Sequence, residues 1–379
     1  MKNCIVCGAP LNGDPLLRCS NMPASAQDIP TLEQLPQDAG IELNLHQCPG
    51  CGLVQFDCEP VSYYRDTIRA GGYSTTMAQL RREQYAHFID LCNLKGKKII
   101  EIGCGQGEFL QVLTEFPVEA YGIEHRADLQ ALACKKGLNV NCNFAEDEAV
   151  KLESGPFDAF LSFNFLEHQP NPNGMMRCIY ENLTDGGYGL ITVPSFEYIL
   201  EQDGFYELLR DHIANYTQDS LRFLIEKNGF QMLECTRINR DTWAMIVQKR
   251  PRVDASGLLR NFDLLAQQVN AYLSKRQQAG KTVCVWGASH QGFTAVSTTA
   301  LATSIRYIID SAPFKQGKYA PASHVPIVSP DHFFCEPVDC ILIIAPGYTQ
   351  EIADTIRSKY GAHIEIAALR TAQIELLEE

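Results

Sequence analysis

The sequence predicts an α/β protein that carries a small cysteine-bearing module at its N-terminus. A short apolar strand runs into a glycine turn and a helix at Ile99–Phe109, and the same order returns at Thr282–Gly292. Two Cys-x-x-Cys pairs near the N-terminus predict the module. Because single cores stop growing near ~250–300 residues, we expect the 379 residues to form three domains, at 1–62, 63–250 and 251–379.

Charge and composition exclude several classes of protein. The formal net charge of −13 argues against a nucleic-acid partner, since such binding depends on Lys and Arg. No stretch approaches the ~18 apolar residues that span a bilayer, and the chain opens without a secretory signal. We therefore expect a cytoplasmic protein with no membrane partner. Fifteen scattered cysteines, an odd number, fit a disulfide framework poorly, so some should be metal ligands.

The order of regular segments indicates where the domains meet. Residues 1–60 are rich in Pro, Cys and Gly and show little periodicity. Helical spacing of apolar residues begins near Tyr63, and strand and helix signals then alternate to about Val247. Lys249–Arg252 predicts a linker, and an amphipathic helix follows from Leu258. The alternation is typical of parallel sheets covered by helices.

The two Cys-x-x-Cys pairs have the spacing of a zinc site. The candidate ligands are Cys4, Cys7, Cys48 and Cys51, and a glycine follows each pair directly. Two such turns let four thiolates converge on one tetrahedral Zn²⁺, and a closed shell leaves no position for substrate, so the expected role is structural. The alternatives are redox pairs or unrelated thiols, and His46 could compete as a ligand.

The first glycine turn suits a nucleoside cofactor. Gly103, Gly105 and Gly107 follow a buried strand, where glycine lets the backbone take unusual angles and a ligand approach closely. Glu124 closes the next strand, where an acidic side chain can accept hydrogen bonds from both ribose hydroxyls. Glu101 precedes the turn and would repel a pyrophosphate. This carboxylate favours a cationic, phosphate-free ligand such as S-adenosylmethionine.

These residues resemble the class I methyltransferases. Glu101–Gly107 matches their glycine motif, Phe157–His168 looks like their fourth strand and its turn, and Leu183–Ile191 looks like the approach to their fifth. The resemblance implies S-adenosylmethionine as cofactor, with His168 as a wall of its pocket. The implied cofactor contacts are Glu101, Gly103, Gly105, Gly107, Glu124, Asn164, Leu166 and His168. The alternatives are a Rossmann-like sheet without cofactor and a nicotinamide-dependent dehydrogenase.

The third block is similar to the C-terminal, Rossmann-like domain of the zinc-containing nucleotide-sugar C-methyltransferases. Val285–Gly292, Ile309–Tyr319 and Val325–Ile327 carry the similarity, and Gly347 stands where that family usually has Asn. A helix N-terminus after the turn could offer N–H groups to a phosphate. The resemblance implies substrate contacts from Ser74, Gly287, Ser289, Lys315 and Tyr319. Lys315 could instead be an ordinary solvated lysine.

Carbon methylation needs a base and a group that steadies an enolate. The segment Leu209–Thr217 aligns with a stretch of that family in which His212 falls on the proposed base and Asp211 on its acidic neighbour. Leu209 stands where the family has Tyr, and Arg210 replaces a His. Tyr73, in a partly kept second motif, is therefore the candidate donor to the reacting oxygen. His212 could otherwise be an ordinary hydrogen-bonded residue, and Tyr73 a core residue.

The resemblance thus implies an S-adenosylmethionine-dependent C-methyltransferase that acts on the keto sugar of a nucleoside-diphosphate sugar. The loss of Tyr at position 209 keeps two alternatives open, an O- or N-methyltransferase and a C-methyltransferase of another small metabolite. A catalytically silent zinc-knuckle scaffold is a third. An RNA methyltransferase is disfavoured by the charge. The expected partner is the small-molecule substrate, and we expect a monomer or weak homo-oligomer.

Overall fold

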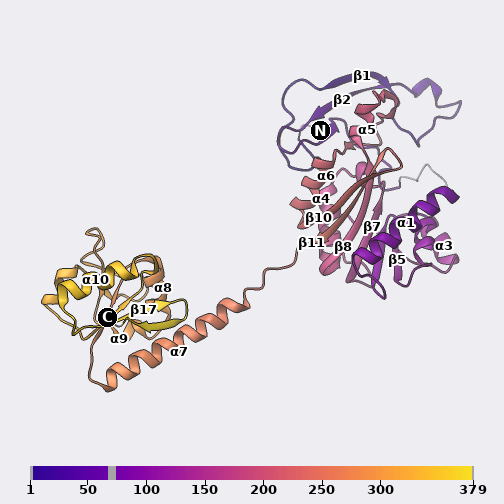
Figure 1. Cartoon of the computed structure of the whole chain (residues 1–379). Helices are drawn as coiled ribbons and strands as arrows, with labels where there is room; N and C mark the ends of the chain where they lie inside the picture. Colours follow the sequence, from indigo (N-terminus) through magenta and orange to yellow (C-terminus); the bar gives the residue numbers. More distant parts are fainter. Residues whose placement is uncertain (1–2, 67–73, 378–379) are drawn as a thin grey trace. The chain divides into compact units, whose positions relative to one another are not determined.

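The computed structural model describes residues 3–66 and 74–377 (Figure 1). The chain forms two compact units, Met1–Arg252 and Val253–Glu379, each of which is an α/β structure. This architecture confirms the predicted α/β fold class. In the part of the chain that the structure describes, none of the helices has the length and apolar character needed to cross a membrane.

The N-terminal sheet of the first unit takes its last strand from far along the chain. Its strands lie in the order β1-β2-β3-β9, and all of its pairs are antiparallel. They are β1 (Leu17–Met22), β2 (Ile41–Gln47), β3 (Val54–Phe56) and β9 (Ala214–Asn215), and the 3₁₀ turn η1 (Leu35–Gln37) lies between β1 and β2. Because β9 pairs with β3, the cysteine-bearing module and the rest of the unit share a sheet.

The central sheet of the first unit has seven strands in the order β10-β11-β8-β7-β4-β5-β6. The pairs from β6 to β8 are parallel, whereas β11 and β10 are antiparallel additions. The strands are β4 (Lys98–Ile102), β5 (Glu119–Glu124), β6 (Asn139–Cys142), β7 (Phe157–Phe163), β8 (Leu183–Pro194), β10 (Phe230–Ile238) and β11 (Thr242–Lys249). The strand order reverses direction between β4 and β7, where open α/β sheets bind ligands at the strands' carboxyl ends.

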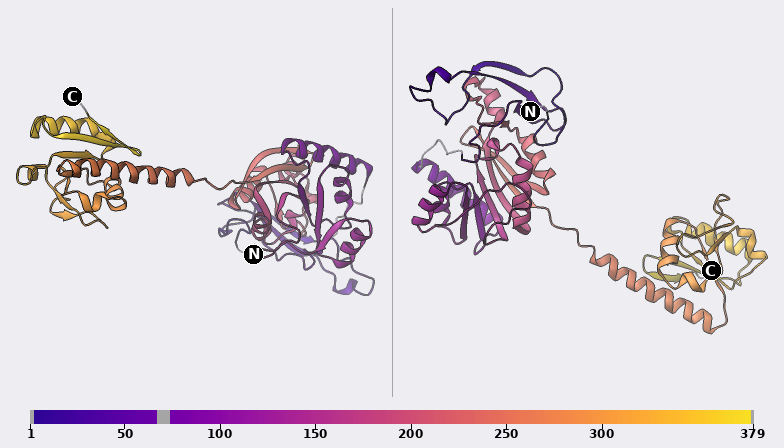
Figure 2. Two further views of the ribbon diagram at one scale, coloured as in Figure 1. Left: turned by 90° about the horizontal axis from the view of Figure 1, so that it is seen from below. Right: turned by 180° about the vertical axis from the view of Figure 1, so that it is seen from behind.

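Helices cover both faces of this sheet (Figures 1 and 2). Ile99 packs with α1 and α2 on one face, while Ile100, the next residue of β4, packs with α4 and α6 on the other. Cys4 and Cys48 belong to this second core, so the module is packed into the unit. The helical segments are α1 (Thr75–Leu91), α2 (Glu108–Leu113), α3 (Ala127–Lys135), η2 (Leu166–His168), α4 (Pro172–Asn182), α5 (Phe196–Glu201), η3 (Phe205–Glu207) and α6 (Gln218–Lys227).

The second unit has its own seven-stranded sheet, ordered β14-β15-β13-β12-β16-β17-β18, with parallel pairs from β15 to β17. Its strands are β12 (Val283–Trp286), β13 (Ile308–Ile309), β14 (Lys318–Tyr319), β15 (Pro326–Val328), β16 (Cys340–Ile343), β17 (Glu365–Arg370) and β18 (Gln373–Leu376). Its helical segments are α7 (Ser256–Gln278), α8 (His290–Thr298), α9 (Leu301–Ser304), η4 (Pro330–Phe334), η5 (Pro346–Tyr348) and α10 (Thr349–Tyr360).

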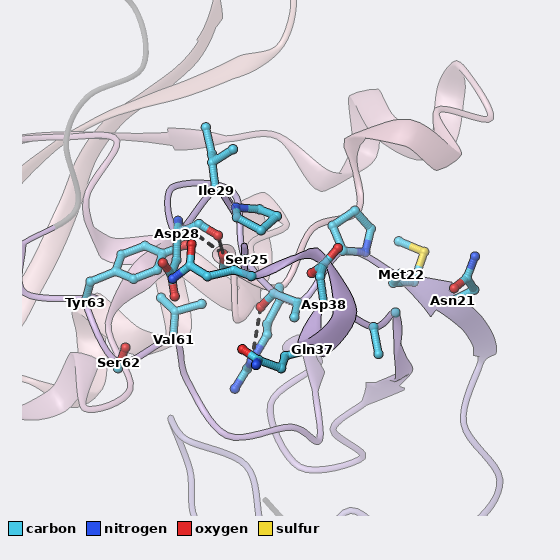
Figure 3. Close-up of a pocket in the computed structure, with 17 residues that line it drawn as sticks. Asn21, Met22, Ser25, Asp28, Ile29, Gln37, Asp38, Val61, Ser62 and Tyr63 are labelled. Carbon is cyan, nitrogen blue, oxygen red and sulfur yellow. Dashed lines mark hydrogen bonds between the residues drawn. The ribbon is translucent and has the colours of Figure 1, made fainter. Parts of the chain in front are cut away.

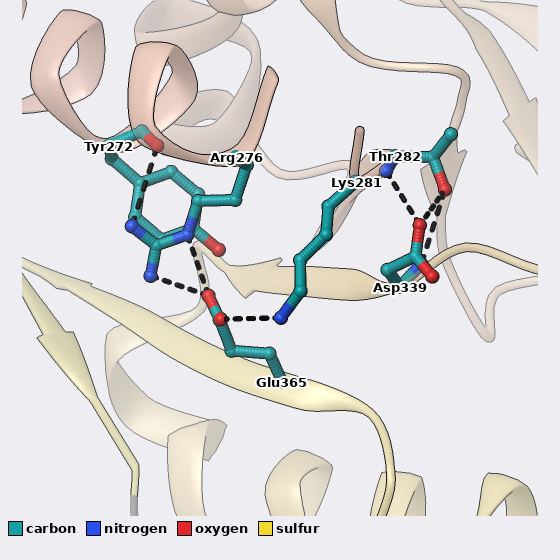
Figure 4. A network of polar contacts seen from close by, with 6 residues as sticks. All are labelled: Tyr272, Arg276, Lys281, Thr282, Asp339 and Glu365. Carbon is teal, nitrogen blue, oxygen red and sulfur yellow. Dashed lines mark hydrogen bonds and ion pairs between the residues drawn. The ribbon is translucent and has the colours of Figure 1, made fainter. Parts of the chain in front are cut away.

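A buried ion pair attaches the end of α7 to this second sheet (Figure 4). Arg276 Nε donates to Glu365 Oε1 at 2.7 Å, and Lys281 Nζ approaches the other carboxylate oxygen at 3.4 Å. The Arg276 guanidinium also lies 3.8 Å from the centre of the Tyr272 ring. Because breaking a buried pair leaves an uncompensated charge, this network fixes where α7 meets the sheet.

Candidate active site

The glycine turn after β4 requires glycine at three positions. Gly103, Gly105 and Gly107 have φ of 69°, 59° and 78°, in the left-handed region that other residues avoid. A Cβ on Gly107 would lie 2.3 Å from Leu138 Cδ1. The turn therefore keeps main-chain atoms at the carboxyl end of β4 open to a ligand.

Two acidic side chains flank this turn. Glu124 is 7% exposed, and its two carboxylate oxygens accept from the N–H groups of Gly105 and Arg126, both at 2.9 Å. A carboxylate has about four acceptor positions, so Glu124 can still accept from a ligand. Glu101 is fully buried within β4. The Glu124 carboxylate therefore leaves acceptor positions beside the turn, which suit hydroxyl or cationic groups of a ligand better than a phosphate.

A cavity of about 480 Å³ lies at this edge of the sheet, within the usual size range of ligand pockets. Five of the eight predicted cofactor residues line this cavity, namely Gly103, Gly105, Glu124, Asn164 and His168. Glu101 and Gly107 belong to β4 and the start of α2 beside it. Leu166 is buried in the core and is not among the described residues that line the cavity.

Asn164, one of the implied cofactor contacts, has a φ of 47° and its side chain accepts from Thr192 Oγ1 at 2.8 Å. Other residues of this cavity carry no sequence signal of their own. Arg81 of α1 is buried, with its guanidinium 3.7 Å from the centre of the Phe163 ring. Ala26, from the N-terminal module, also lines the cavity. These positions depend on contacts between distant segments, so no local motif indicates them.

Two histidine rings are in contact at one side of the cavity. His168 and His212 have ring centres 4.8 Å apart and planes at 73°. His168 Nδ1 lies 2.8 Å from the main-chain oxygen of Asp211. Because a carbonyl only accepts, Nδ1 carries the proton and Nε2, 4.0 Å from a carboxylate oxygen of Glu167, has the free lone pair.

Burial keeps both imidazoles neutral. It lowers the pKa of His168, and it lowers the pKa of His212 to about 3, with a smaller contribution from the neighbouring His168. At neutral pH His212 is therefore unprotonated, and the same burial makes it a weaker base than a free imidazole.

The side chain of Asp211 faces the N-terminal module. Its carboxylate accepts from Tyr63 Oη at 2.7 Å and from the Ala26 N–H at 3.0 Å, and the residue is 3% exposed. Only the main chain of Asp211 bonds to His168. Leu209 lines the cavity with an apolar side chain. Tyr73, the predicted oxygen donor, lies outside the described residues.

A second cavity, of about 650 Å³, lies on the module side of this segment (Figure 3). Ser25, Asp28 and Tyr63 line it together with Arg210. Neighbouring residues of the same two segments, Ala26 with Gln27 and Leu209 with Asp211, line the first cavity instead. The segments 25–28 and 209–211 therefore lie between the two cavities.

Two of the predicted substrate residues of the second unit, Gly287 and Lys315, lie beside one carboxylate that the sequence did not single out. Gly287 has a φ of 126°, and Ser289 caps α8 by accepting from the Gly292 N–H at 3.1 Å. Asp310 accepts from the N–H that follows Gly287 at 2.9 Å, and from Lys315 Nζ at 3.0 Å. Lys315 is therefore part of an ion pair.

The remaining two predicted substrate residues lie elsewhere. Tyr319 is 67% exposed on β14, in the second unit. Ser74, in the first unit, is exposed and caps α1 by accepting from the Met77 N–H at 3.1 Å.

The four predicted zinc ligands lie together. Their sulfur atoms are all within 4.8 Å of one another, with Cys4 to Cys51 at 3.5 Å and Cys7 to Cys48 at 3.3 Å. Main-chain N–H groups of the two turns point at the sulfurs, which would steady thiolates. The donor set fits a tetrahedral Zn²⁺ ion. His46 is paired instead with Asp57, at 3.5 Å.

Comparison with known proteins defines the class. Residues 77–235 match the family described as a methyltransferase domain, and residues 258–365 match the C-methyltransferase C-terminal domain. C-methyltransferase NovU of Streptomyces niveus is 22% identical over 300 residues, which is 70% of this chain and 71% of NovU. A ubiquinone biosynthesis O-methyltransferase of Chromobacterium violaceum is 29% identical over 108 residues, covering 27% of this chain and 46% of that enzyme.

A solved magnesium protoporphyrin IX methyltransferase from Synechocystis, with bound SAH, superposes with a TM-score of 0.37 at 14% identity, covering 48% of this chain and 90% of that one. From the matching families and NovU, the protein is an S-adenosylmethionine-dependent methyltransferase. The match of the second unit to the C-methyltransferase C-terminal domain, the similarity to NovU and the cysteine cluster together support the S-adenosylmethionine-dependent C-methyltransferase family.

The cysteine cluster predicts one zinc ion per chain, which metal analysis of the purified protein would measure. Cys48→Ser should lose the metal and lower the thermal midpoint by more than about 4 °C, because Cys48 belongs to the core of the first unit. Cys335→Ser is the matched control, since Cys335 is exposed in the second unit. Wild-type protein without zinc, or full zinc in Cys48→Ser, would contradict the assignment.

The environment of His212 predicts a dependence of stability on pH. An unfolded chain binds this proton near pH 6.5, whereas the folded chain binds it near pH 3. The free energy of unfolding should therefore fall as pH falls below about 6.5. In His212→Gln the slope should be smaller by up to about 1.4 kcal/mol per pH unit, measured by urea unfolding between pH 6.5 and 4.5. The control is His290→Gln, an exposed ring, and an unchanged slope in His212→Gln would contradict the account.

Proposed function

We propose that this methyltransferase moves the methyl group of S-adenosylmethionine to a carbon atom of a keto sugar carried by a nucleoside diphosphate. The observation that carries the proposal is the neutral His212 ring at the wall of a cavity formed by the glycine turn. The similarity to C-methyltransferase NovU supports attachment to carbon.

The residues around the turn fit S-adenosylmethionine. Glu124 would accept from the ribose hydroxyls with its remaining lone pairs, and the main chain at Gly103 and Gly105 would contact the cofactor closely. Glu101 is buried in the adjoining strand, and Glu167 lines the cavity, so both add negative charge beside a cationic group. When bound, the cofactor supplies an electrophilic methyl group on a positively charged sulfur.

His212 would act on the acceptor. A ring nitrogen of His212 takes the proton from the carbon beside the ketone, and the electron pair of that C–H bond forms an enolate. The new C–C bond forms as the S–CH₃ bond breaks, and the proton stays on His212 until solvent removes it. The contact with His168 holds the ring in place. Tyr73 remains the proposed donor to the enolate oxygen.

The second unit would bind the nucleotide part. The N–H groups of the turn after Gly287 and the hydroxyl of Ser289 are the proposed phosphate contacts, with Tyr319 as a further contact. Ser74 is a proposed substrate contact of the first unit. Lys315 shares its charge with Asp310, so main-chain donors would carry more of the diphosphate binding than this lysine. We further propose a zinc ion in the module. A cytoplasmic location and a monomeric or weakly associated state stay predictions.

One observation favours a second candidate, methylation of oxygen or nitrogen on another small metabolite. Leu209 gives the cavity an apolar wall where a C-methyltransferase of sugars has a phenol. The partial match to an O-methyltransferase of ubiquinone biosynthesis is consistent with this candidate.

Calorimetry and methyl-transfer assays on the same variants test the proposal. Glu124→Gln should weaken S-adenosylmethionine binding about tenfold or more, because it removes a charged acceptor. His212→Gln should bind the cofactor within about threefold of wild type and transfer methyl about 10²- to 10⁴-fold more slowly. The control is Glu375→Gln, on the second unit. If the wild-type protein does not bind S-adenosylmethionine, the proposed function is wrong. If His212→Gln transfers methyl at the wild-type rate, His212 is not the base.

A further inference from the structure

Two consecutive residues join the N-terminal module to the histidine pair. Arg210 donates to main-chain oxygens of two parts of the module, to Ala24 at 3.0 Å and to Glu59 at 3.0 and 3.1 Å. These carbonyls belong to loops that follow β1 and β3. The guanidinium therefore holds two separate loops of the module to the segment before β9.

Asp211 extends this attachment towards the cavity. Its buried carboxylate accepts from Tyr63 Oη and from the Ala26 N–H, and the same phenol oxygen also accepts from the N–H groups of Ala26 and Gln27 at 3.1 Å. All of the module's contacts with this carboxylate come from the loops that Arg210 holds. Since hydrogen bonds to a charged acceptor are about twice as strong as neutral ones, this cluster resists displacement.

The main chain of Asp211 then determines the state of His168. Its carbonyl oxygen accepts the Nδ1 proton of His168 at 2.8 Å, which selects one tautomer, and the His168 ring packs against His212. A shift of the Asp211 backbone would therefore alter both rings. The side chain of Asp211 does not reach the imidazoles, so its effect on them passes through its own main chain.

The first Cys-x-x-Cys turn connects through β3 to the segment that carries Asp211 and His212. Gln55 of β3 is fully buried and accepts from the Ile5 N–H, between Cys4 and Cys7, at 2.9 Å. The same residue is paired with Ala214 of β9, two residues after His212. Hydrogen bonds thus run without a break from the Cys4–Cys7 turn through β3 to β9, which follows His212.

We propose that Arg210 and Asp211 form a clamp through which the N-terminal module sets the tautomer of His168 and the position of His212. Asp211 and Tyr63 are then positioning residues, and the module is part of the catalytic apparatus. The inference deepens the proposed function and rests on it for the role of His212 as base. The clamp also gives a role to Arg210 where the family has His, because a guanidinium has donors for both loops whereas a neutral imidazole has one.

Nitrogen NMR of the full chain labelled with ¹⁵N-histidine tests the clamp, with signals of His168 and His212 assigned from their Gln variants. In wild type His168 should be the Nδ1–H tautomer. Tyr63→Phe removes the phenol that supports Asp211, so it should lower the Nδ1–H fraction of His168 and reduce kcat about tenfold, with KM for S-adenosylmethionine within about threefold. Removal of zinc by a chelator should change the His168 signal in the same direction.

Tyr206→Phe is the matched control, because Tyr206 is 85% exposed and lies outside both cavities. Asp211→Asn is the second variant and should change the tautomer more strongly, since one of the two oxygens that accept from Tyr63 and Ala26 becomes an NH₂ donor. Wild-type His168 and His212 signals in Tyr63→Phe, or after zinc removal, would overturn the clamp. The NMR measurement needs no methyl-accepting substrate. Failure to methylate a keto sugar would therefore overturn the proposed function, whereas the NMR result alone tests the clamp.

Discussion

The pairing of β9 with β3 is the constraint on which the first unit depends. The segment that leads into β9 belongs to two structures at once, because it closes the module's sheet and carries His212 into the cavity. A chain that folded the module separately would leave Asp211 buried without its donors, and an unpaired buried carboxylate is strongly unfavourable. The module is therefore required for the shape of the reaction cavity, beyond its own folding.

Charge is distributed differently in the two units. In the first unit, Glu101, Glu124 and Glu167 lie in or beside one cavity, which suits a cationic cofactor in an acidic protein. In the second unit the one carboxylate of the glycine turn, Asp310, is neutralised by Lys315. The two glycine turns have one hydrogen bond in common. In each, an acidic residue at the end of the next strand, Glu124 or Asp310, accepts from a main-chain N–H of the turn. A lysine also contacts each turn, Lys136 at the main-chain oxygen of Gln106 and Lys315 at Asp310.

The sequence predicted best those features whose chemistry is local. Cys-x-x-Cys spacing and glycines with forced backbone angles identify the cysteine cluster and the turn, because neighbouring residues create both. Tyr63 and Arg81 could not be found in this way, since their roles arise from contacts across the fold. The sequence predicted β4, β5, β7 and β8. It missed the edge strands β10 and β18, which are half exposed and lack a continuous apolar run, and also the buried strand β17.

The same limit applies to the direction of side chains. The alignment of Asp211 with an acidic residue suggested a partner for the base, yet a one-residue step along an irregular segment turns its carboxylate towards Tyr63. The sequence likewise did not predict the ion pair of Lys315 with Asp310. Leu166 matched a cofactor motif and nevertheless packs in the core, whereas Phe165 and Glu167 on either side of it line the cavity.

Transfer from ¹³C-methyl-labelled S-adenosylmethionine to a nucleoside-diphosphate keto sugar labelled with ¹³C tests the central claim most directly. If His212 generates an enolate, the carbon NMR spectrum of the product will show a one-bond carbon–carbon coupling at the new methyl signal, and His212→Gln will form little of it. A methyl signal without that coupling would place the group on oxygen or nitrogen and contradict the account.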